Sequence, residues 1–265
     1  MTDNDNNWVL PENLRKQEAA ERAMVDGGDM KVGHCGAYYA YRTGVDKTLI
    51  ESHAVTEDAY ALQYVQNIAA LLGSMGVRLG GNILDAGCGL GFITNALAKV
   101  NPKGRAFGLD ISEDAVAVAG EKYPDCSFSA QSADELDNFE DGFFDIIHSR
   151  EFYPFTRVDD ADLHCRFLKA FAGKLKPGGA VLLQMIIEAH GFCNTYNGLN
   201  DRLRGFGYDR IKRKVVVPLR LFRKAGALSY AAPVYGGIRL AAGVWGRFQP
   251  DRIGYLYYLR KAPDA

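Results

Sequence analysis

The sequence lacks the features that mark disulfide-bonded, zinc-binding or membrane-spanning proteins. Its five cysteines are scattered over 265 residues and form no C-x-x-C pair, so neither a disulfide framework nor a zinc site is indicated. The N-terminus MTDNDNNWVL has no basic start followed by an apolar run, as a secretory signal would. No stretch of roughly 18 uncharged apolar residues predicts a membrane span. We therefore expect a cytoplasmic protein with no resident metal.

An overall excess of charge of one sign is also missing. The chain has 31 basic and 32 acidic residues, which gives no general attraction to nucleic acid or anionic membranes. Residues 202–224, however, hold nine basic residues and one acid. We favour a solvated face beside a substrate-covering insertion, and contact with a lipid-linked acceptor or a membrane surface is the alternative. Nucleic acid is disfavoured because no recognised RNA- or DNA-binding module flanks this run.

Helical and strand patterns alternate from residue 56 onward. Apolar side chains at 61, 65, 68 and 72 predict an amphipathic helix over 56–72. Short apolar runs then predict strands at 82–87, 105–112, 126–131, 143–149 and 180–187, with helices at 91–100, 113–123 and 159–175 between them. Two further strands are expected at 208–218 and 252–261, whereas the glycines and proline of 228–248 argue against one long amphipathic helix there. This order is typical of parallel βαβ units.

The glycine-rich stretch DAGCGLGF, residues 85–92, falls where the first strand ends and its helix begins. That position suits a ligand held against backbone N–H groups. Phe92 occupies the place where a dinucleotide fingerprint needs a small residue, and the Lys-Ser/Thr pair of a phosphate-binding P-loop is absent. Asp85 precedes the loop and Asp110 ends the second strand. This arrangement favours a ligand with a ribose and a positive charge but no phosphate.

Four stretches in order, ILDAGCGLGF, GLDIS, SADEL with EDGFFDII, and LKPGGAVLL, resemble the motifs of class I S-adenosylmethionine-dependent methyltransferases. The resemblance covers about residues 81–188. It implies a Rossmann-like, doubly wound α/β fold with a mostly parallel seven-stranded sheet and an antiparallel last strand. We expect an N-terminal helical cap or lid over 1–44, a methyltransferase domain over 45–265 with its cofactor core at 81–188, and an insertion at about 219–249 between the last two strands.

The resemblance also implies a site for S-adenosylmethionine. The loop would surround the methionine part, an acid would hold the ribose, and Ser132–Ala133 stands where the family often has an Asp-Ala pair at the adenine edge. Whether Ser132 or its neighbour Asp134 meets the adenine amine stays open. The tyrosines of residues 38–41 are expected either to form a lid or to pack a loop onto the core. The expected cofactor residues are Asp85, Gly87, Cys88, Gly89, Gly91, Asp110, Ile111, Ser132, Ala133, Asp134 and Tyr38.

The octapeptide HSREFYPF, residues 148–155, follows the fourth strand and is expected beside the transferable methyl group. FDIIHSRE is similar to the corresponding stretch of phosphoethanolamine methyltransferases, in which an acid at the position of Glu151 meets the substrate amine. Those enzymes have a histidine where this sequence has Phe155, so their proton relay is not carried over. Pro154 is expected to keep Tyr153 in a loop. The candidate catalytic residues are Glu151, His190 and His148, and the candidate substrate contacts are Arg150, Tyr153 and Glu188.

These observations predict methyl transfer to a small-molecule acceptor, such as a sugar, a lipid-linked compound or a natural-product intermediate. Methylation of oxygen is favoured over nitrogen. For His148, a structural role in the core competes with catalysis, and Arg150 would bind an anionic group or pair with Glu151. The rival functions are a non-catalytic S-adenosylmethionine-binding scaffold and a nicotinamide-dependent reductase. The sequence does not indicate an oligomeric state.

Overall fold

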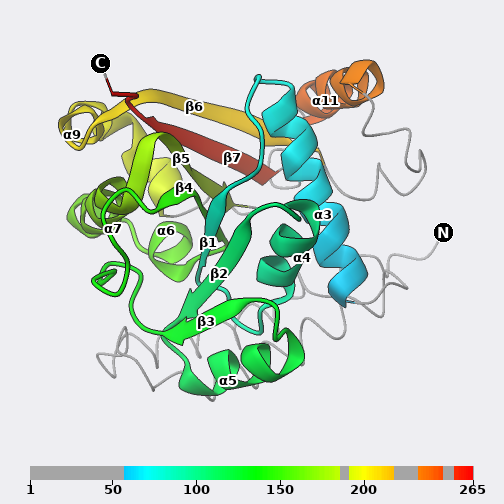
Figure 1. Ribbon diagram of the computed structural model, residues 1–265. Coiled ribbons are helices and arrows are strands. Elements are labelled where there is room, and N and C mark those ends of the chain that lie inside the picture. Colours follow the sequence, from blue (N-terminus) through cyan, green and yellow to red (C-terminus); the bar gives the residue numbers. More distant parts are fainter. Residues whose placement is uncertain (1–56, 186–190, 218–231, 247–253, 265) are drawn as a thin grey trace, which may run out of the picture.

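A single seven-stranded sheet with helices on both faces organises the chain (Figure 1). The structure is a computed structural model that describes residues 57–185, 191–217, 232–246 and 254–264. The strand order is β3-β2-β1-β4-β5-β7-β6, and β7 alone runs in the direction opposite to the other six strands. The predicted fold class is therefore confirmed. The strands are β1 (Asn82–Ala86), β2 (Arg105–Asp110), β3 (Ser127–Ala130), β4 (Phe144–Arg150), β5 (Leu175–Met185), β6 (Tyr208–Val216) and β7 (Gly254–Lys261).

The helices divide between the two faces of the sheet and enclose two apolar cores. One core joins α3, α4 and α11 to the sheet, and the other joins α7, α8 and α9 to its opposite face (Figure 1). Successive residues of β7 alternate between the cores, as the two-residue period of a strand requires. The described helices are α3 (Glu57–Gly73), α4 (Phe92–Val100), α5 (Glu113–Lys122), α6 (Tyr153–Arg157), α7 (Ala161–Lys174), α8 (Phe192–Thr195), the 3-10 turn η2 (Tyr196–Gly198), α9 (Asn200–Gly205) and α11 (Ala232–Gly246).

Two local predictions were wrong, and both concern segments that contain a proline. Tyr153 lies in the helix α6 rather than in a loop, because Pro154 occupies the first turn, where its missing N–H has no helical partner to lose. The segment 232–246 forms α11 despite its glycines. Pro233 is again in the first turn, and the burial of Tyr235 and Ala242 against the sheet offsets the weak helix propensity.

The order of the strands switches direction at β1. β2 and β3 follow on one side of β1, whereas β4 and the later strands lie on its other side, so β1 and β4 flank a switch point of the sheet. Ligands of such sheets bind outside the carboxyl ends of the strands at this switch point. The glycine loop after β1, Asp110 at the end of β2 and Arg150 at the end of β4 all lie at this edge. In the described part of the chain, no helix has the length and apolar character needed to cross a membrane.

The start of α4 is expected to tolerate only glycine. Gly91 has φ 78°, and a Cβ there would lie 2.8 Å from the Phe128 ring and 2.9 Å from the Cβ of Ala119. We predict that Gly91→Ala lowers the free energy of unfolding by at least about 2 kcal/mol, through backbone strain and overpacking. The matched control is Gly120→Ala in α5, where an added Cβ meets nothing within 4 Å. It should raise stability by about 1 kcal/mol, and urea denaturation of both variants checks the pair.

Candidate cofactor and acceptor site

The loop between β1 and α4 contains three glycines in left-handed conformations. Gly87, Gly89 and Gly91 have φ values of 76°, 51° and 78°, which other residues rarely adopt. The backbone N–H groups of Gly87 and Cys88 both donate to the carbonyl of Leu109 at 2.9 Å. The loop is thereby tied to the end of β2. A Cβ at Gly87 would lie 2.6 Å from the ring of Phe152, so this glycine also gives room to the chain leaving β4.

Asp110 connects the glycine loop with the helix that follows β2. Its carboxylate accepts hydrogen bonds from the backbone N–H groups of Gly89 at 2.9 Å and Ser112 at 3.0 Å. The side chain of Ser112 in turn caps α5 by accepting from the N–H of Ala115. The next residue, Ile111, is partly buried. A buried carboxylate oriented in this way is suited to accept hydrogen bonds from the hydroxyls of a ribose.

Asp85 lies beneath the loop, with 2% of its surface exposed. One carboxylate oxygen accepts from the Thr94 hydroxyl at 2.8 Å, and the other lies 2.8 Å from Nδ1 of His148. Nε2 of His148 lies 2.8 Å from the hydroxyl of Tyr64 on α3. Burial raises the pKa of Tyr64 well above its ordinary value, so its hydroxyl stays protonated. Every group is satisfied when Tyr64 donates to Nε2 and Nδ1–H donates to Asp85.

Cys88 lies inside the loop and is almost fully buried. Burial raises the pKa of its thiol well above the ordinary value, and the nearby carboxylates of Asp110 and Asp85 raise it further. The thiol therefore stays protonated and acts as a small packing group in the loop.

The guanidinium of Arg150 is fixed at the end of β4 by two hydrogen bonds. Nε donates to the side-chain oxygen of Gln184 at 3.1 Å, and a terminal nitrogen donates to the Tyr60 hydroxyl at 3.0 Å. The guanidinium carbon also lies 4.8 Å from the centre of the Tyr64 ring. Burial lowers the pKa of Arg150, but Tyr60, Tyr64 and Glu151 raise it more, and the net change is upward. The positive charge at this position is permanent.

Glu151 has a strained backbone. Its φ of 50° makes it the one residue other than glycine with a positive φ in the described part of the chain. Its N–H donates to the backbone carbonyl of Gln184 at 3.0 Å. A left-handed conformation costs a residue with a Cβ about 1–2 kcal/mol. Such strain is most often found at binding and catalytic sites, and here it turns the chain at the edge that also holds the glycine loop.

The edge beyond β3 contains a residue that sequence reasoning missed. The side-chain nitrogen of Gln131 is the one buried side-chain nitrogen or oxygen without a hydrogen-bond partner among the described residues. Ser132 donates to Asp134, and the other carboxylate oxygen of Asp134 forms an ion pair with Arg166 at 2.6 Å. Ala133 is buried. Gln131 directly precedes Ser132–Ala133, and that adjacency is the signal that could have identified it.

The remaining candidate residues fall into two groups. Tyr153 begins α6, next to Phe152, whose ring packs against Phe155 and Phe167. Glu188, His190 and Tyr38 lie outside the described residues, as does the predicted N-terminal cap. Thus the described structure brings Asp85, Asp110, the glycines, Arg150 and Glu151 to one edge of the sheet and places the predicted adenine residues at the end of β3.

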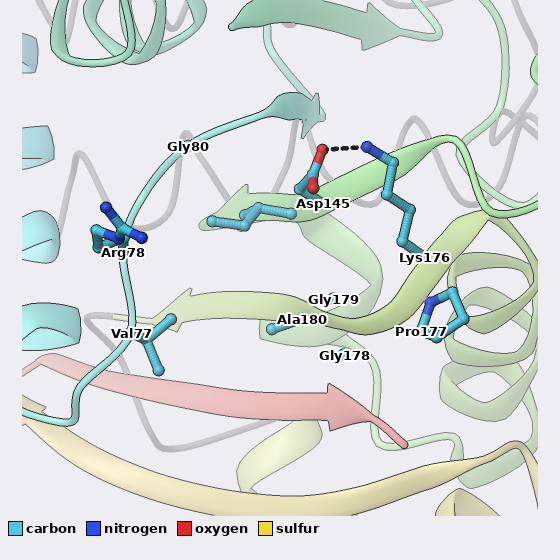
Figure 2. A pocket seen from close by; sticks show the side chains of 10 residues that line it. Val77, Arg78, Gly80, Asp145, Lys176, Pro177, Gly178, Gly179 and Ala180 are labelled. Atoms are coloured by element: carbon cyan, nitrogen blue, oxygen red, sulfur yellow. Dashed lines mark hydrogen bonds and ion pairs between the residues drawn. The ribbon is translucent and has the colours of Figure 1, made fainter. Parts of the chain in front are cut away.

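A pocket of about 400 Å³ lies at the opposite edge of the sheet. Figure 2 shows it between the chain that enters β1 and the start of β5, with an ion pair between Asp145 and Lys176. Arg78, Gly80 and Pro177 contribute to its wall. Because it lies at the amino ends of β4 and β5, it is separate from the glycine loop. Within the described ranges, no three His, Cys, Asp or Glu side chains gather as metal ligands would.

Comparison with known families decides the class of this domain. Residues 79–197 match the family described as "Methyltransferase domain". These residues include β1 to β5, the glycine loop and Asp110. They form a class I S-adenosylmethionine-dependent methyltransferase domain.

Individual relatives resemble the chain in sequence or in fold. The chain is 26% identical over 191 residues to a malonyl-[acyl-carrier protein] O-methyltransferase of Bacillus cytotoxicus, covering 68% of this chain and 63% of that protein. Its fold is similar to a chain of the Haloferax volcanii complex between the Trm112 methyltransferase activator and a methyltransferase, with a TM-score of 0.53, 21% identity and coverage of 87% and 96%. It is also similar to a phosphoethanolamine N-methyltransferase of Haemonchus contortus, with a TM-score of 0.50, 18% identity and coverage of 76% and 53%. The chain spans less than two thirds of the curated relatives that it matches.

The hydrogen bond between Tyr64 and His148 is expected to contribute to the stability of the methyltransferase domain. Tyr64→Phe leaves Nε2 of His148 buried without a donor, which should lower the free energy of unfolding by about 1–3 kcal/mol. In a His148→Ala background the same substitution should cost much less, because the partner is already gone. Urea denaturation of the two single variants and the double variant measures this coupling. Strictly additive effects would show that the two side chains do not interact.

Proposed function

We propose that the chain transfers a methyl group from S-adenosylmethionine to a small-molecule acceptor that meets Glu151. The observation that carries the proposal is the convergence, at one edge of one sheet, of a glycine loop, a fixed acid at the end of β2 and a strained acid after β4. The first two features suit the cofactor, and the third would meet the second reactant.

The cofactor would lie along the carboxyl ends of β1, β2 and β3. The glycine loop gives backbone close to the methionine part, and Asp110 would hold the ribose hydroxyls. Asp85 bonds to two buried side chains beneath the loop, Thr94 and His148, and would act by supporting the loop from below. The unpaired amide nitrogen of Gln131 is a donor suited to an adenine ring nitrogen. With Ser132, Gln131 is our candidate for adenine recognition.

The chemistry requires mainly alignment, because the cofactor supplies a methyl group already activated on a sulfonium. The chain's own contribution is to hold the acceptor atom in line and to exclude water. Glu151 would take the proton from a hydroxyl acceptor or hold the ammonium of an amine acceptor. Arg150, fixed by Gln184 and Tyr60, supplies a permanent positive charge for an anionic group of the acceptor. His148 would be a positioning residue, because it belongs to the buried series of hydrogen bonds that joins Asp85 to Tyr64 beneath the loop.

We favour an oxygen acceptor. The carboxylate of Glu151 would accept the proton of a hydroxyl, and Phe155, at the position where the similar phosphoethanolamine enzymes have a histidine, is buried in the apolar core. The Bacillus relative is named as an O-methyltransferase and the Haemonchus enzyme as an N-methyltransferase. Their names thus represent both outcomes, and the acceptor has to be identified by experiment.

Incubation of the purified full-length chain with methyl-labelled S-adenosylmethionine and a small-molecule extract tests the proposal. A labelled small molecule, identified by mass spectrometry, is the expected result. Tight cofactor binding with no labelled product in any extract would favour the scaffold alternative. Binding of NADPH in place of S-adenosylmethionine, measured by calorimetry, would favour the reductase.

Glu151→Gln tests the role of the acid after β4. The substitution keeps the size of the side chain and removes its charge, so kcat for a hydroxyl acceptor should fall at least about 100-fold. For an amine acceptor held by the carboxylate, KM should rise instead. Glu135→Gln, at an exposed acid between β3 and β4, is the matched control and should change neither value. Unchanged kinetics of Glu151→Gln would remove Glu151 from the mechanism.

Asp110→Asn tests the ribose contact separately from the chemistry. Loss of a charged acceptor should weaken S-adenosylmethionine binding about 10- to 100-fold, as measured by calorimetry. Asp114→Asn, in the exposed first turn of α5, should leave the affinity unchanged. Equal affinities for the wild type and the Asp110 variant, with both folded, would contradict this assignment.

A further inference from the structure

The charge of this chain is distributed very unevenly along the sequence. Residues 210–250 contain nine basic residues and no acidic one, which leaves 22 basic and 32 acidic residues in the rest of the chain. The segment includes most of β6 and all of α11. Four of the nine basic residues lie on β6, the last strand at one side of the sheet, and Arg239 lies on α11.

Three of these basic residues form a row on one face of β6. Arg210, Lys212 and Lys214 alternate along the strand and pair with Arg260, Tyr258 and Leu256 of β7. Tyr258 and Leu256 belong to the core that contains α3 and α11, so the row lies on the same face of the sheet as those two helices.

The row is open to solvent to different degrees along the strand. Arg210 and Lys212 are exposed and Lys214 is partly exposed. The nearest acid along the strand, Asp209, is neutralised by an ion pair with Arg260, whose Nε lies 2.9 Å from the carboxylate. The positive field of the row is thus not cancelled by its neighbour.

The helix α11 presents apolar side chains outward. Leu240 is 73% exposed and Val244 is 53% exposed, and they lie one turn apart on the helix. Val234, near the start of α11, is also exposed. These three and Val118 are the large apolar side chains that the described structure leaves exposed. Three of the four therefore lie on one short helix.

The inner face of α11 is firmly attached to the domain. Tyr235 is buried, and its hydroxyl donates to the side-chain oxygen of Asn67 on α3 at 3.1 Å. Asn67 also donates to the carbonyl of Val217, just after β6, at 2.7 Å. A helix held in this way keeps its outer face in a constant orientation relative to the basic row.

We propose that the outer face of α11 and the basic row of β6 dock the protein on an anionic membrane surface. Exposed aliphatic side chains enter the boundary between headgroups and acyl chains, and lysines and arginines beside them attract anionic headgroups. A nucleic acid would match the cations but would leave Leu240 and Val244 in water. The absence of acidic residues throughout 210–250 matches a negatively charged bilayer.

The basic strand β6 ends on the side of the sheet at which the strands before the binding loops also end. β6 runs antiparallel to β7, which is antiparallel to β5, so β6 ends at Val216 on the same edge as β5. A protein docked through α11 would turn this edge toward compounds in the bilayer. That consequence rests on the proposed function and indicates a lipid-borne acceptor, whereas membrane docking itself does not depend on methyl transfer.

Co-sedimentation of the full-length protein with vesicles tests the proposal without cofactor or substrate. Binding to vesicles of phosphatidylcholine mixed with phosphatidylglycerol should be at least about tenfold stronger than binding to phosphatidylcholine alone. Leu240→Glu with Val244→Glu should abolish it, and Lys212→Glu with Lys214→Glu should weaken it at least about tenfold. Val118→Glu replaces a comparably exposed side chain, 48% exposed on α5, and should bind like the wild type.

Each contrary result overturns the proposal. Equal sedimentation with both vesicle types, or unchanged binding of the α11 variant, would exclude this surface. A dimer that the α11 substitutions dissociate, with no vesicle binding by the wild type, would assign the face to a second copy of the chain. Preferential binding of duplex RNA over anionic vesicles would assign the basic row to nucleic acid.

Failure of the labelled-methyl assay with intact vesicle binding would leave docking in place and remove only the proposed reaction.

Discussion

The buried carboxylate of Asp85 is the constraint around which the binding edge is organised. A charge in this position would be strongly destabilising without partners, because burial removes its hydration. Its partners come from three other elements: Thr94 from α4, His148 from β4 and, through His148, Tyr64 from α3. Satisfying one carboxylate therefore fixes the loop after β1 relative to the neighbouring strand and the helix that precedes the sheet.

The same helix also fixes the positive charge at the end of β4. His148 and Arg150 are two residues apart on one strand, so their side chains leave the same face, and both contact Tyr64. Tyr60, one turn earlier on α3, bonds to the guanidinium. α3 thus connects the support beneath the glycine loop with the group that would meet an acceptor. A shift of α3 would therefore disturb His148 beneath the glycine loop and Arg150 at the end of β4 at the same time.

Much of the fold could be predicted from the sequence because it depends on local patterns. Alternating apolar runs, the glycine loop and Asp110 after the second strand are read within short windows, and the order of the strands follows from the family resemblance. The contacts of Asp85 could not be predicted, since His148 is 63 residues away and Tyr64 is on a helix outside the motif set. Pro154 misled prediction because its effect depends on whether it falls at the start or in the interior of a helix.

Glu151 shows how the fold produces a site from a strand. From Ile146 onward, side chains along β4 alternate between the two faces of the sheet, and Arg150 still follows that alternation toward α3. Glu151 follows with a left-handed backbone, which ends the alternation. Phe152 then joins the opposite core, where its ring packs against Phe155 and Phe167. Gln184 of β5 holds both sides of this turn, because its side chain bonds to Arg150 and its backbone carbonyl accepts the N–H of Glu151. The strain at Glu151 is therefore maintained by a neighbouring strand of the sheet, which holds the backbone of Glu151 and the guanidinium of Arg150 in a fixed relation to each other.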